Sequence, residues 1–200
     1  MDMPPYDDNL DRLLAIASGV FAQKGYHPTT MRDLARATGM SLAGMYHYVQ
    51  GKDELLYLIQ ERCFTRVLEG GEAVVADDGP AVDRLRRFIR HHVTFFAAHM
   101  SEMKVLSHEA LSLSDERVSG INALKRRYVA ILTNLVREVT HDSDTNSTVA
   151  AYALFGMMNW IYNWYDPHAA VGPEALADHF AAIYLHGLTA PSPASVPHGG

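Results

Sequence analysis

The sequence predicts an all-α protein of about nine helices, because three observations agree. Apolar residues recur at helical spacing along almost the whole chain, no segment alternates with the two-residue period of a strand, and capping and stop residues divide the chain into helix-sized segments. The 200 residues are 48% hydrophobic, enough for a sizeable core. We expect a three-helix domain over residues 1–52, a larger helical domain over residues 53–190 and a disordered tail over residues 191–200.

The first three predicted helices carry clear start and stop signals. The first runs through Phe21 and ends at Lys24 and Gly25, a cation for the last turn and a residue that accepts a left-handed backbone. Thr30 is a good N-cap for the second helix, and Ser41 for the third. These signals predict three short helices before residue 52.

Six longer helices are expected after residue 51, separated by polar or proline-containing breaks. The breaks are Asp77 to Pro80, a position near Met100, a cap at Ser114, His141 to Ser147 and Asp166 to Gly172. The helix predicted from Val149 to Tyr165 is apolar on nearly all sides. We therefore expect other surfaces to cover it all round.

Composition excludes several classes of protein. Cys63 is the only cysteine, so no internal disulfide framework can form, and no apolar run reaches the length of a membrane span. The N-terminus lacks the pattern of a secretory signal, so we expect a cytoplasmic protein with no membrane partner. The formal net charge of −6 means that any DNA binding must use a local patch.

The strongest motif lies between residues 31 and 50 and predicts a helix-turn-helix. Ala35 is small where two helices would cross, and Gly39 can take the positive φ that turns the chain. Leu34, Met40 and Met45 would lock the helices together. The third helix would then present its N-terminal half to the major groove of double-stranded DNA. The alternative from this pattern alone is a tight helical hairpin without DNA function.

The predicted DNA contacts follow from this geometry. The third helix supplies the base readers, while its last residue, the start of the fourth helix and the cap of the second are placed for phosphates. The predicted contacts are Thr30, Ser41, Leu42, Ala43, Gly44, Tyr46, His47, Tyr48 and Lys52.

A longer stretch of sequence around this motif, from residue 21 to residue 56, resembles a known family. The matching segments are residues 21–26, residue 41, residues 51–56, Thr29-Thr30-Met31-Arg32-Asp33-Leu34-Ala35 and Met45-Tyr46-His47-Tyr48. Together they closely resemble the DNA-binding domain of the TetR family. The resemblance implies an all-helical homodimeric repressor that binds a palindromic operator. Leu42 departs from the Lys or Arg of many relatives, so a bidentate contact to guanine is lost there.

The C-terminal half is dense in aromatic residues and methionines, and it is the expected site of a small hydrophobic effector. Core packing is the alternative for each of these residues. Asn159 and Asn163 add polar groups one turn apart, and a buried amide needs a partner that a ligand can supply. The predicted ligand contacts are Phe96, Met100, Met103, His108, Tyr128, Asn159, Trp160, Asn163 and Trp164.

A looser similarity concerns the effector. Residues 107–109, 125–128 and 156–167 look similar to the TetR-family branch that regulates fatty-acid and steroid breakdown, which implies an acyl-CoA thioester. Lys125, Arg126 or Arg127 would then bind CoA phosphates, unless they only form a solvated helix face. A hydrophobic drug, with an efflux gene as target, remains an alternative effector. A helical ligand-binding protein without DNA function is a further alternative.

In the family the last two helices form the dimer contact, and the effector moves the recognition helices. The resemblance places the interface at Tyr152, Leu176, Phe180, Ile183 and Tyr184. We expect the effector to push the fourth helix and to change the separation of the two recognition helices, which must match half-sites one DNA turn apart.

Enzymatic and metal-dependent functions find little support. His108 and Glu109 start like a zinc-peptidase helix, but the second histidine is absent. His92 and His99 could share a face with Glu102, yet no third ligand follows at metal-binding spacing. The glycines from 39 to 44 lack the Lys-Ser/Thr of a phosphate loop. We expect no enzyme activity, no metal and no cofactor.

Overall fold

The computed structural model describes residues 6–76, 78–109, 112–113, 115–140, 146–168 and 170–189. Within them the chain is all-helical, as predicted, with nine α-helices and one 3₁₀ turn. The bounds are α1 Tyr6–Lys24, α2 Met31–Thr38, α3 Leu42–Tyr48, α4 Lys52–Ala76, α5 Ala81–Ala98, α6 Met100–His108, α7 Asp115–Thr140, α8 Ser147–Asn159, η1 Trp160–Asn163 and α9 Pro173–Thr189. The predicted tail, residues 191–200, lies outside the described residues.

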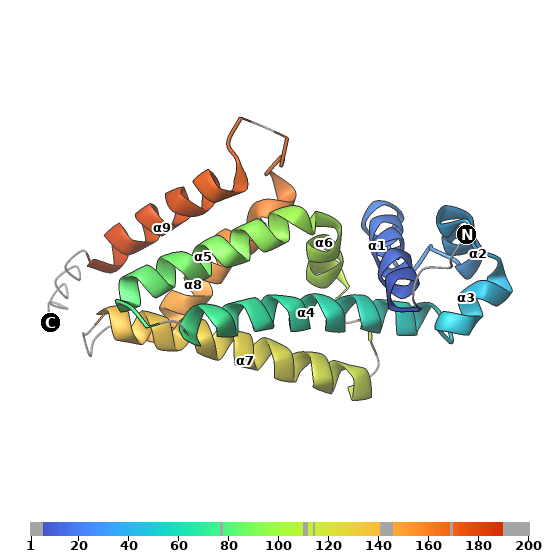
Figure 1. Cartoon of the computed structure of the whole chain (residues 1–200), viewed down its shortest axis with the longest axis horizontal. Helices are drawn as coiled ribbons and strands as arrows, with labels where there is room; N and C mark the ends of the chain where they lie inside the picture. The colour runs from blue at the N-terminus through green and yellow to red at the C-terminus, as the bar shows by residue number, and fades with distance from the viewer. Residues whose placement is uncertain are drawn as a thin grey trace, which may run out of the picture.

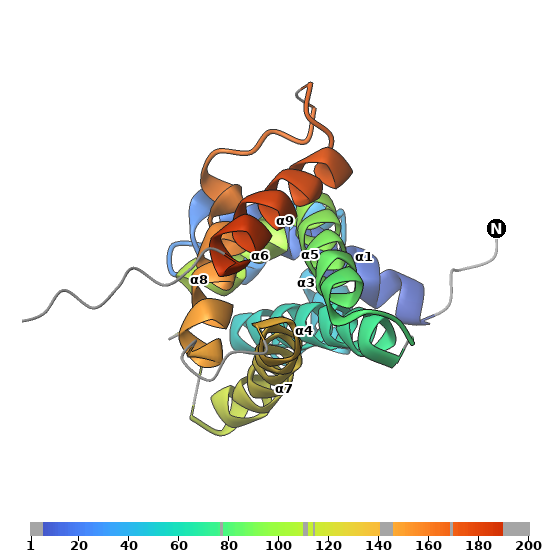
Figure 2. The ribbon, with the colours of Figure 1, turned by 90° about the vertical axis from the view of Figure 1, so that its left-hand side faces the viewer.

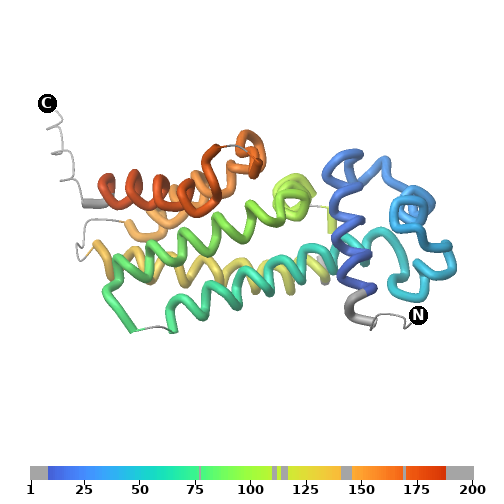
Figure 3. The backbone as a smooth tube through the Cα atoms, turned by 45° about the horizontal axis from the view of Figure 1, so that its top comes forward, coloured from blue at the N-terminus to red at the C-terminus, as the bar shows by residue number. Residues whose placement is uncertain are grey.

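The molecule is elongated, with α1, α2 and α3 gathered at one end (Figure 1). Helix α4 runs from that end along α7, while α5 packs against α4, α7 and α9. Viewed along the long axis, α7 and α9 lie on opposite sides of the bundle (Figure 2). Helix α1 crosses the first part of α4, and α6 packs against α1 (Figure 3).

Two apolar cores correspond to the two ends of the molecule. The larger one is built from α4 to α9, and the smaller one from α1 to α3. The smaller core also takes in Leu55, Leu56 and Ile59 of α4, together with Val105 of α6 and Ile121 of α7. The predicted boundary at residue 52 falls at the first residue of α4, but side chains beyond it complete the first core.

The predicted helix from Val149 to Tyr165 differs from the observed one. Helix α8 ends at Asn159 and continues as the 3₁₀ turn η1. The residues here are rich in Trp, Tyr and Asn, which are weak helix formers. Among the described helices, none is long and apolar enough to cross a membrane.

Candidate DNA-binding surface and effector pocket

Helices α2 and α3 form a helix-turn-helix with the predicted caps. The Thr30 hydroxyl accepts from the Asp33 amide, and the Asp33 carboxylate accepts from the Thr30 amide. Gly39 has φ of 72°, the left-handed backbone that closes α2, and the Ser41 hydroxyl accepts from the Gly44 amide at 3.0 Å. Met45 is fully buried between the helices.

The N-terminal half of α3 is open to solvent, as base readout requires. Most of the residues predicted as readers are exposed, and Gly44 and Tyr48 are half-buried. The side chain of Tyr46 is 54% exposed, against 36% for Leu42. The exposed readers are Ser41, Leu42, Ala43, Tyr46 and His47.

Lys52 takes a different role from the predicted phosphate contact. Its ammonium group donates to the backbone carbonyls of Tyr26 at 2.8 Å and His27 at 3.0 Å, and lies 4.3 Å from the centre of the Tyr26 ring. These contacts turn the charge toward the protein. Lys52 thus fastens the start of α4 to the turn between α1 and α2, and its contact with a DNA phosphate stays a prediction.

The positive charge left for DNA is sparse. The ammonium of Lys24 pairs with Asp33 at 2.6 Å, and this contact holds the pKa of the Asp33 carboxyl well below its usual range. Arg32 and Arg36 are exposed on α2, and no described residue forms an ion pair with either. They are the cations of the helix-turn-helix that can reach phosphates.

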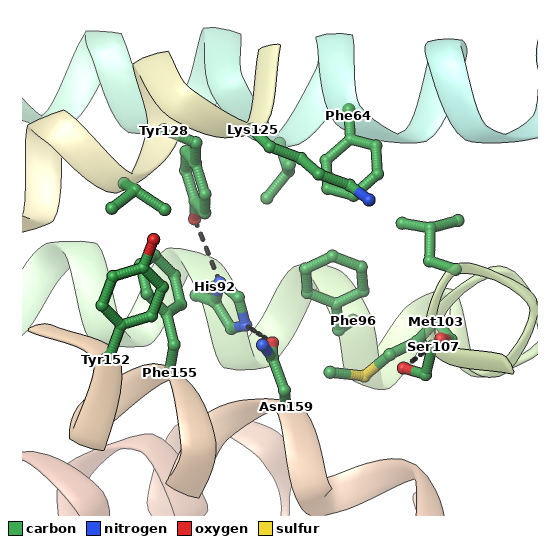
Figure 4. Close-up of a pocket in the computed structure, with 13 residues that line it drawn as sticks. Phe64, His92, Phe96, Met103, Ser107, Lys125, Tyr128, Tyr152, Phe155 and Asn159 are labelled. Atoms are coloured by element: carbon green, nitrogen blue, oxygen red, sulfur yellow. Dashed lines mark hydrogen bonds between the residues drawn. The ribbon is translucent and has the colours of Figure 1, made fainter. Parts of the chain in front are cut away.

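A pocket of about 340 Å³ lies between α4, α5, α6, α7 and α8 (Figure 4). Its walls are mainly apolar and aromatic, and the ring of Tyr128 in the wall lies 5.0 Å from that of Phe88, tilted by 32°. The lining residues are Phe64, Val67, His92, Phe96, Met103, Leu106, Ser107, Lys125, Tyr128, Val129, Tyr152, Phe155 and Asn159.

The pocket lies in the predicted effector half, and it brings together some of the predicted ligand contacts but not others. Four predicted ligand contacts line it, namely Phe96, Met103, Tyr128 and Asn159. The other five do not line it, because the chain turns them elsewhere. Trp160 and Trp164 are 60% and 55% exposed, Asn163 and His108 are also exposed, and Met100 packs against the larger core.

Sequence reasoning missed His92 and Phe155 as pocket residues, and it placed Tyr152 only at the dimer contact. The sequence pattern places His92 on the apolar face of the fifth helix and gives it no ligand contact. Its position on the buried stripe of α5, facing the aromatic residues of α7 and α8, was the available signal. Burial lowers the pKa of His92 to about 3, so the ring is neutral.

An open, polar groove of about 500 Å³ adjoins the pocket along α7 and α8. The two share Lys125, Val129 and Tyr152. Arg126 and Arg137 also line the groove, and Arg137 donates only to the Asn134 side chain at 3.0 Å among the described residues. A mainly apolar pocket thus lies beside a groove whose lining includes three cationic side chains.

Helices α8, η1 and α9 carry an exposed apolar face. This face, which we name the α8–α9 face, consists of Val149, Tyr152, Trp160, Trp164 and Ile183, each more than half exposed. The remaining predicted interface residues, Leu176, Phe180 and Tyr184, are at most 9% exposed in the chain's own core. Helix α9 packs these side chains toward α5, and their place in a dimer contact stays a prediction.

Comparison with known families decides the class of the protein. Residues 13–57 match the family model described as bacterial regulatory proteins, tetR family. Residues 78–188, more than half of the chain, match the model described as tetracyclin repressor-like, C-terminal domain. The chain belongs to the TetR family. This TetR-family protein is a helix-turn-helix transcriptional repressor that binds operator DNA and a small effector, and it is not an enzyme.

Individual relatives agree with this assignment. The HTH-type transcriptional repressor KstR2 of Rhodococcus jostii is 23% identical, over 96% of this chain and 99% of its own. PfmR of Thermus thermophilus has a TM-score of 0.82 and 29% identity, over 90% of this chain and 100% of its own. AibR in complex with isovaleryl coenzyme A and operator DNA has a TM-score of 0.78 and 28% identity, over 88% of this chain and 97% of its own.

Proposed function

We propose that this TetR-family repressor binds a palindromic operator as a homodimer and is released from it by an acyl-CoA thioester. One observation carries the choice of effector: an apolar pocket adjoins a groove lined by Lys125, Arg126 and Arg137 and shares lining residues with it. An acyl chain suits aromatic and aliphatic walls, and the phosphates of CoA suit Arg and Lys. AibR, which is similar in fold and was solved with isovaleryl coenzyme A, supports the proposal.

The lining of the groove indicates which cationic side chains would bind the phosphates of CoA. Lys125 lies at the junction, with its ammonium 4.9 Å from the centre of the Phe64 ring, and burial lowers its pKa. Arg126 and Arg137 line the groove itself. Arg127 instead pairs with Glu72 at 2.5 Å and lines neither cavity. We therefore assign the phosphates to Lys125, Arg126 and Arg137.

The α8–α9 face is the surface through which we propose that two copies of the chain form a homodimer. Five large apolar side chains that are each more than half exposed on α8, η1 and α9 are typical of an interaction surface. A second copy of the chain can cover the face through a two-fold contact, which would also shield the outward side of α8. The face lies away from α3, so both recognition helices stay free for two half-sites (Figure 1).

Calorimetric titration of the purified protein tests the effector. A medium-chain acyl-CoA should bind at least about tenfold more tightly than either the free fatty acid or CoA alone. Arg137→Ala should weaken acyl-CoA binding about threefold to tenfold, whereas Arg127→Ala, one matched control on the same helix, should leave it unchanged. Equal binding of the acid and its thioester would contradict the proposal, and binding of hydrophobic drugs without any CoA ester would favour the drug-responsive alternative.

A further inference from the structure

Three polar side chains from three helices form a hydrogen-bonded chain across the pocket. The Tyr128 hydroxyl of α7 lies 3.2 Å from His92 Nδ1 of α5, and His92 Nε2 lies 3.1 Å from Asn159 Oδ1 at the end of α8. Figure 4 shows the chain running between the apolar walls, with Phe96 and Met103 on one side and Tyr152 and Phe155 on the other. All three chain members line the pocket.

The direction of each hydrogen bond follows from the chemistry of the partners. The Asn159 oxygen can only accept, so His92 Nε2 must carry the proton and donate. A neutral imidazole has one N–H, so Nδ1 accepts, and the Tyr128 hydroxyl donates to it. The pKa of His92, lowered by burial, agrees with a neutral ring.

This arrangement leaves the Asn159 amide nitrogen for a ligand. Within the described part of the chain, no group accepts a hydrogen bond from Asn159 Nδ2. Two further hydroxyls line the pocket: that of Ser107 donates to the Met103 carbonyl at 2.9 Å, and that of Tyr152 belongs to a side chain that is more than half exposed. Asn159, Lys125 and Tyr152 are therefore the donors that the pocket offers to a ligand, and such a pocket selects a ligand that brings an acceptor.

We propose that Asn159 is a specificity-determining residue that donates its amide N–H to the carbonyl oxygen of the bound effector. His92 is a positioning residue, because its Nε2–H holds the Asn159 oxygen and turns the amide nitrogen toward the ligand. The inference rests on the proposed acyl-CoA function, where the acceptor is the thioester carbonyl. Asn159 is exposed in the chain without ligand, so water can pair with its amide there. A ligand that fills the pocket excludes this water, and an analogue without the carbonyl then leaves the N–H unpaired.

A pair of ligands that differ only at this carbonyl tests the inference. Calorimetry compares an acyl-CoA with the S-alkyl-CoA thioether of equal chain length, in which a methylene replaces the carbonyl. The wild-type protein should bind the thioester about tenfold more tightly. Asn159→Leu should bring the ratio of the two dissociation constants to about one, with the thioether bound as in the wild type.

Variants of His92 separate positioning from simple packing. His92→Gln places an amide N–H near the position of Nε2 and should keep the thioester preference, whereas His92→Phe cannot donate and should lose it. Tyr128→Phe removes a donor that points at His92 rather than at the ligand, so the preference should survive. If Tyr128→Phe abolishes the preference and Asn159→Leu does not, the inference is overturned.

The wild-type measurement keeps this inference distinct from the proposed function. If the protein binds neither CoA ligand, the acyl-CoA function fails. If it binds the thioester and the thioether equally, the acyl-CoA function stands and the role of Asn159 is overturned. This comparison needs no substitution, so it does not depend on whether a variant folds.

Discussion

The ring of Tyr128 lies against the backbone of α4 at Gly71. A Cβ added there would stand 2.7 Å from Tyr128 Cε2 and 3.4 Å from Phe88 Cε2. Gly71→Ala should therefore push the aromatic cluster behind the pocket and lower the free energy of unfolding by about 1 to 3 kcal/mol. Urea denaturation measures this loss.

Gly19 in α1 is the matched control. A Cβ there meets nothing within 4 Å, so Gly19→Ala should raise the free energy of unfolding by about 0.5 to 1 kcal/mol, because alanine restricts the unfolded chain. If both substitutions change stability in the same direction, the close approach at Gly71 does not hold.

His92 predicts a pH dependence of stability. Its folded pKa of about 3 lies below the ordinary value of 6.5, so between these values the unfolded chain binds more protons than the folded one. Stability should fall as pH drops through this window, by roughly 1 kcal/mol per pH unit. Urea denaturation between about pH 4.5 and pH 7 should show a smaller slope for His92→Gln, and equal slopes would contradict a buried neutral ring.

Helix α6 connects the pocket to the DNA-binding end. Met103, Leu106 and Ser107 line the pocket on one side of the helix. Just past its end, the carboxylate of Glu109 accepts from the Tyr26 amide at 3.4 Å, beside the turn that precedes α2. The helix expected to carry the coupling, α4, contributes Phe64 to the pocket, and we propose α6 as a second route.

Glu109→Ala should weaken this coupling. In the wild type we expect the effector to lower operator affinity about 5-fold to 150-fold, and the variant should reduce that factor at least about threefold while still binding the effector. Fluorescence anisotropy with labelled operator measures the factor. Lys104→Ala, at an exposed position of α6, is the control, and an unchanged factor in Glu109→Ala would exclude this route.

Local signals in the sequence predicted the elements well, since caps act over three or four residues. Thr30, Gly39 and Ser41 all take the predicted roles, and α9 begins at Pro173 as expected. The pocket depends instead on five helices that are far apart in sequence and meet only in the folded chain. His92 and Phe155 were missed for this reason, because periodicity marks a buried face without showing what lies opposite.

The α8–α9 face is a property of the whole molecule. Ile183 is 64% exposed on α9, and an arginine there would place an unpaired charge in the proposed interface. Ile183→Arg should raise the dimer dissociation constant at least about tenfold in sedimentation equilibrium. Val82→Arg, at an exposed position of α5, should leave it unchanged, and an equal effect of both would contradict the assignment of the interface.

The elongated shape of the molecule separates the pocket from the helix-turn-helix (Figure 1), and the proposed switch must act across this separation. The helix-turn-helix lies at one end of the molecule (Figure 3), while the pocket is lined by residues of α4, α5, α6, α7 and α8. A small shift of α4 and α6 at the pocket would therefore tilt α3 relative to its copy in a dimer. Operator half-sites have a set spacing, so a tilt should disfavour simultaneous contact with both.

Operator binding in the presence of acyl-CoA tests the central claim most directly. DNA from the protein's own promoter region is titrated with the repressor by anisotropy, with and without a saturating acyl-CoA, at one stated salt concentration. We predict that the thioester raises the operator dissociation constant at least about fivefold, while the free acid and CoA alone leave it unchanged. An operator affinity that is the same with and without saturating thioester would contradict the account.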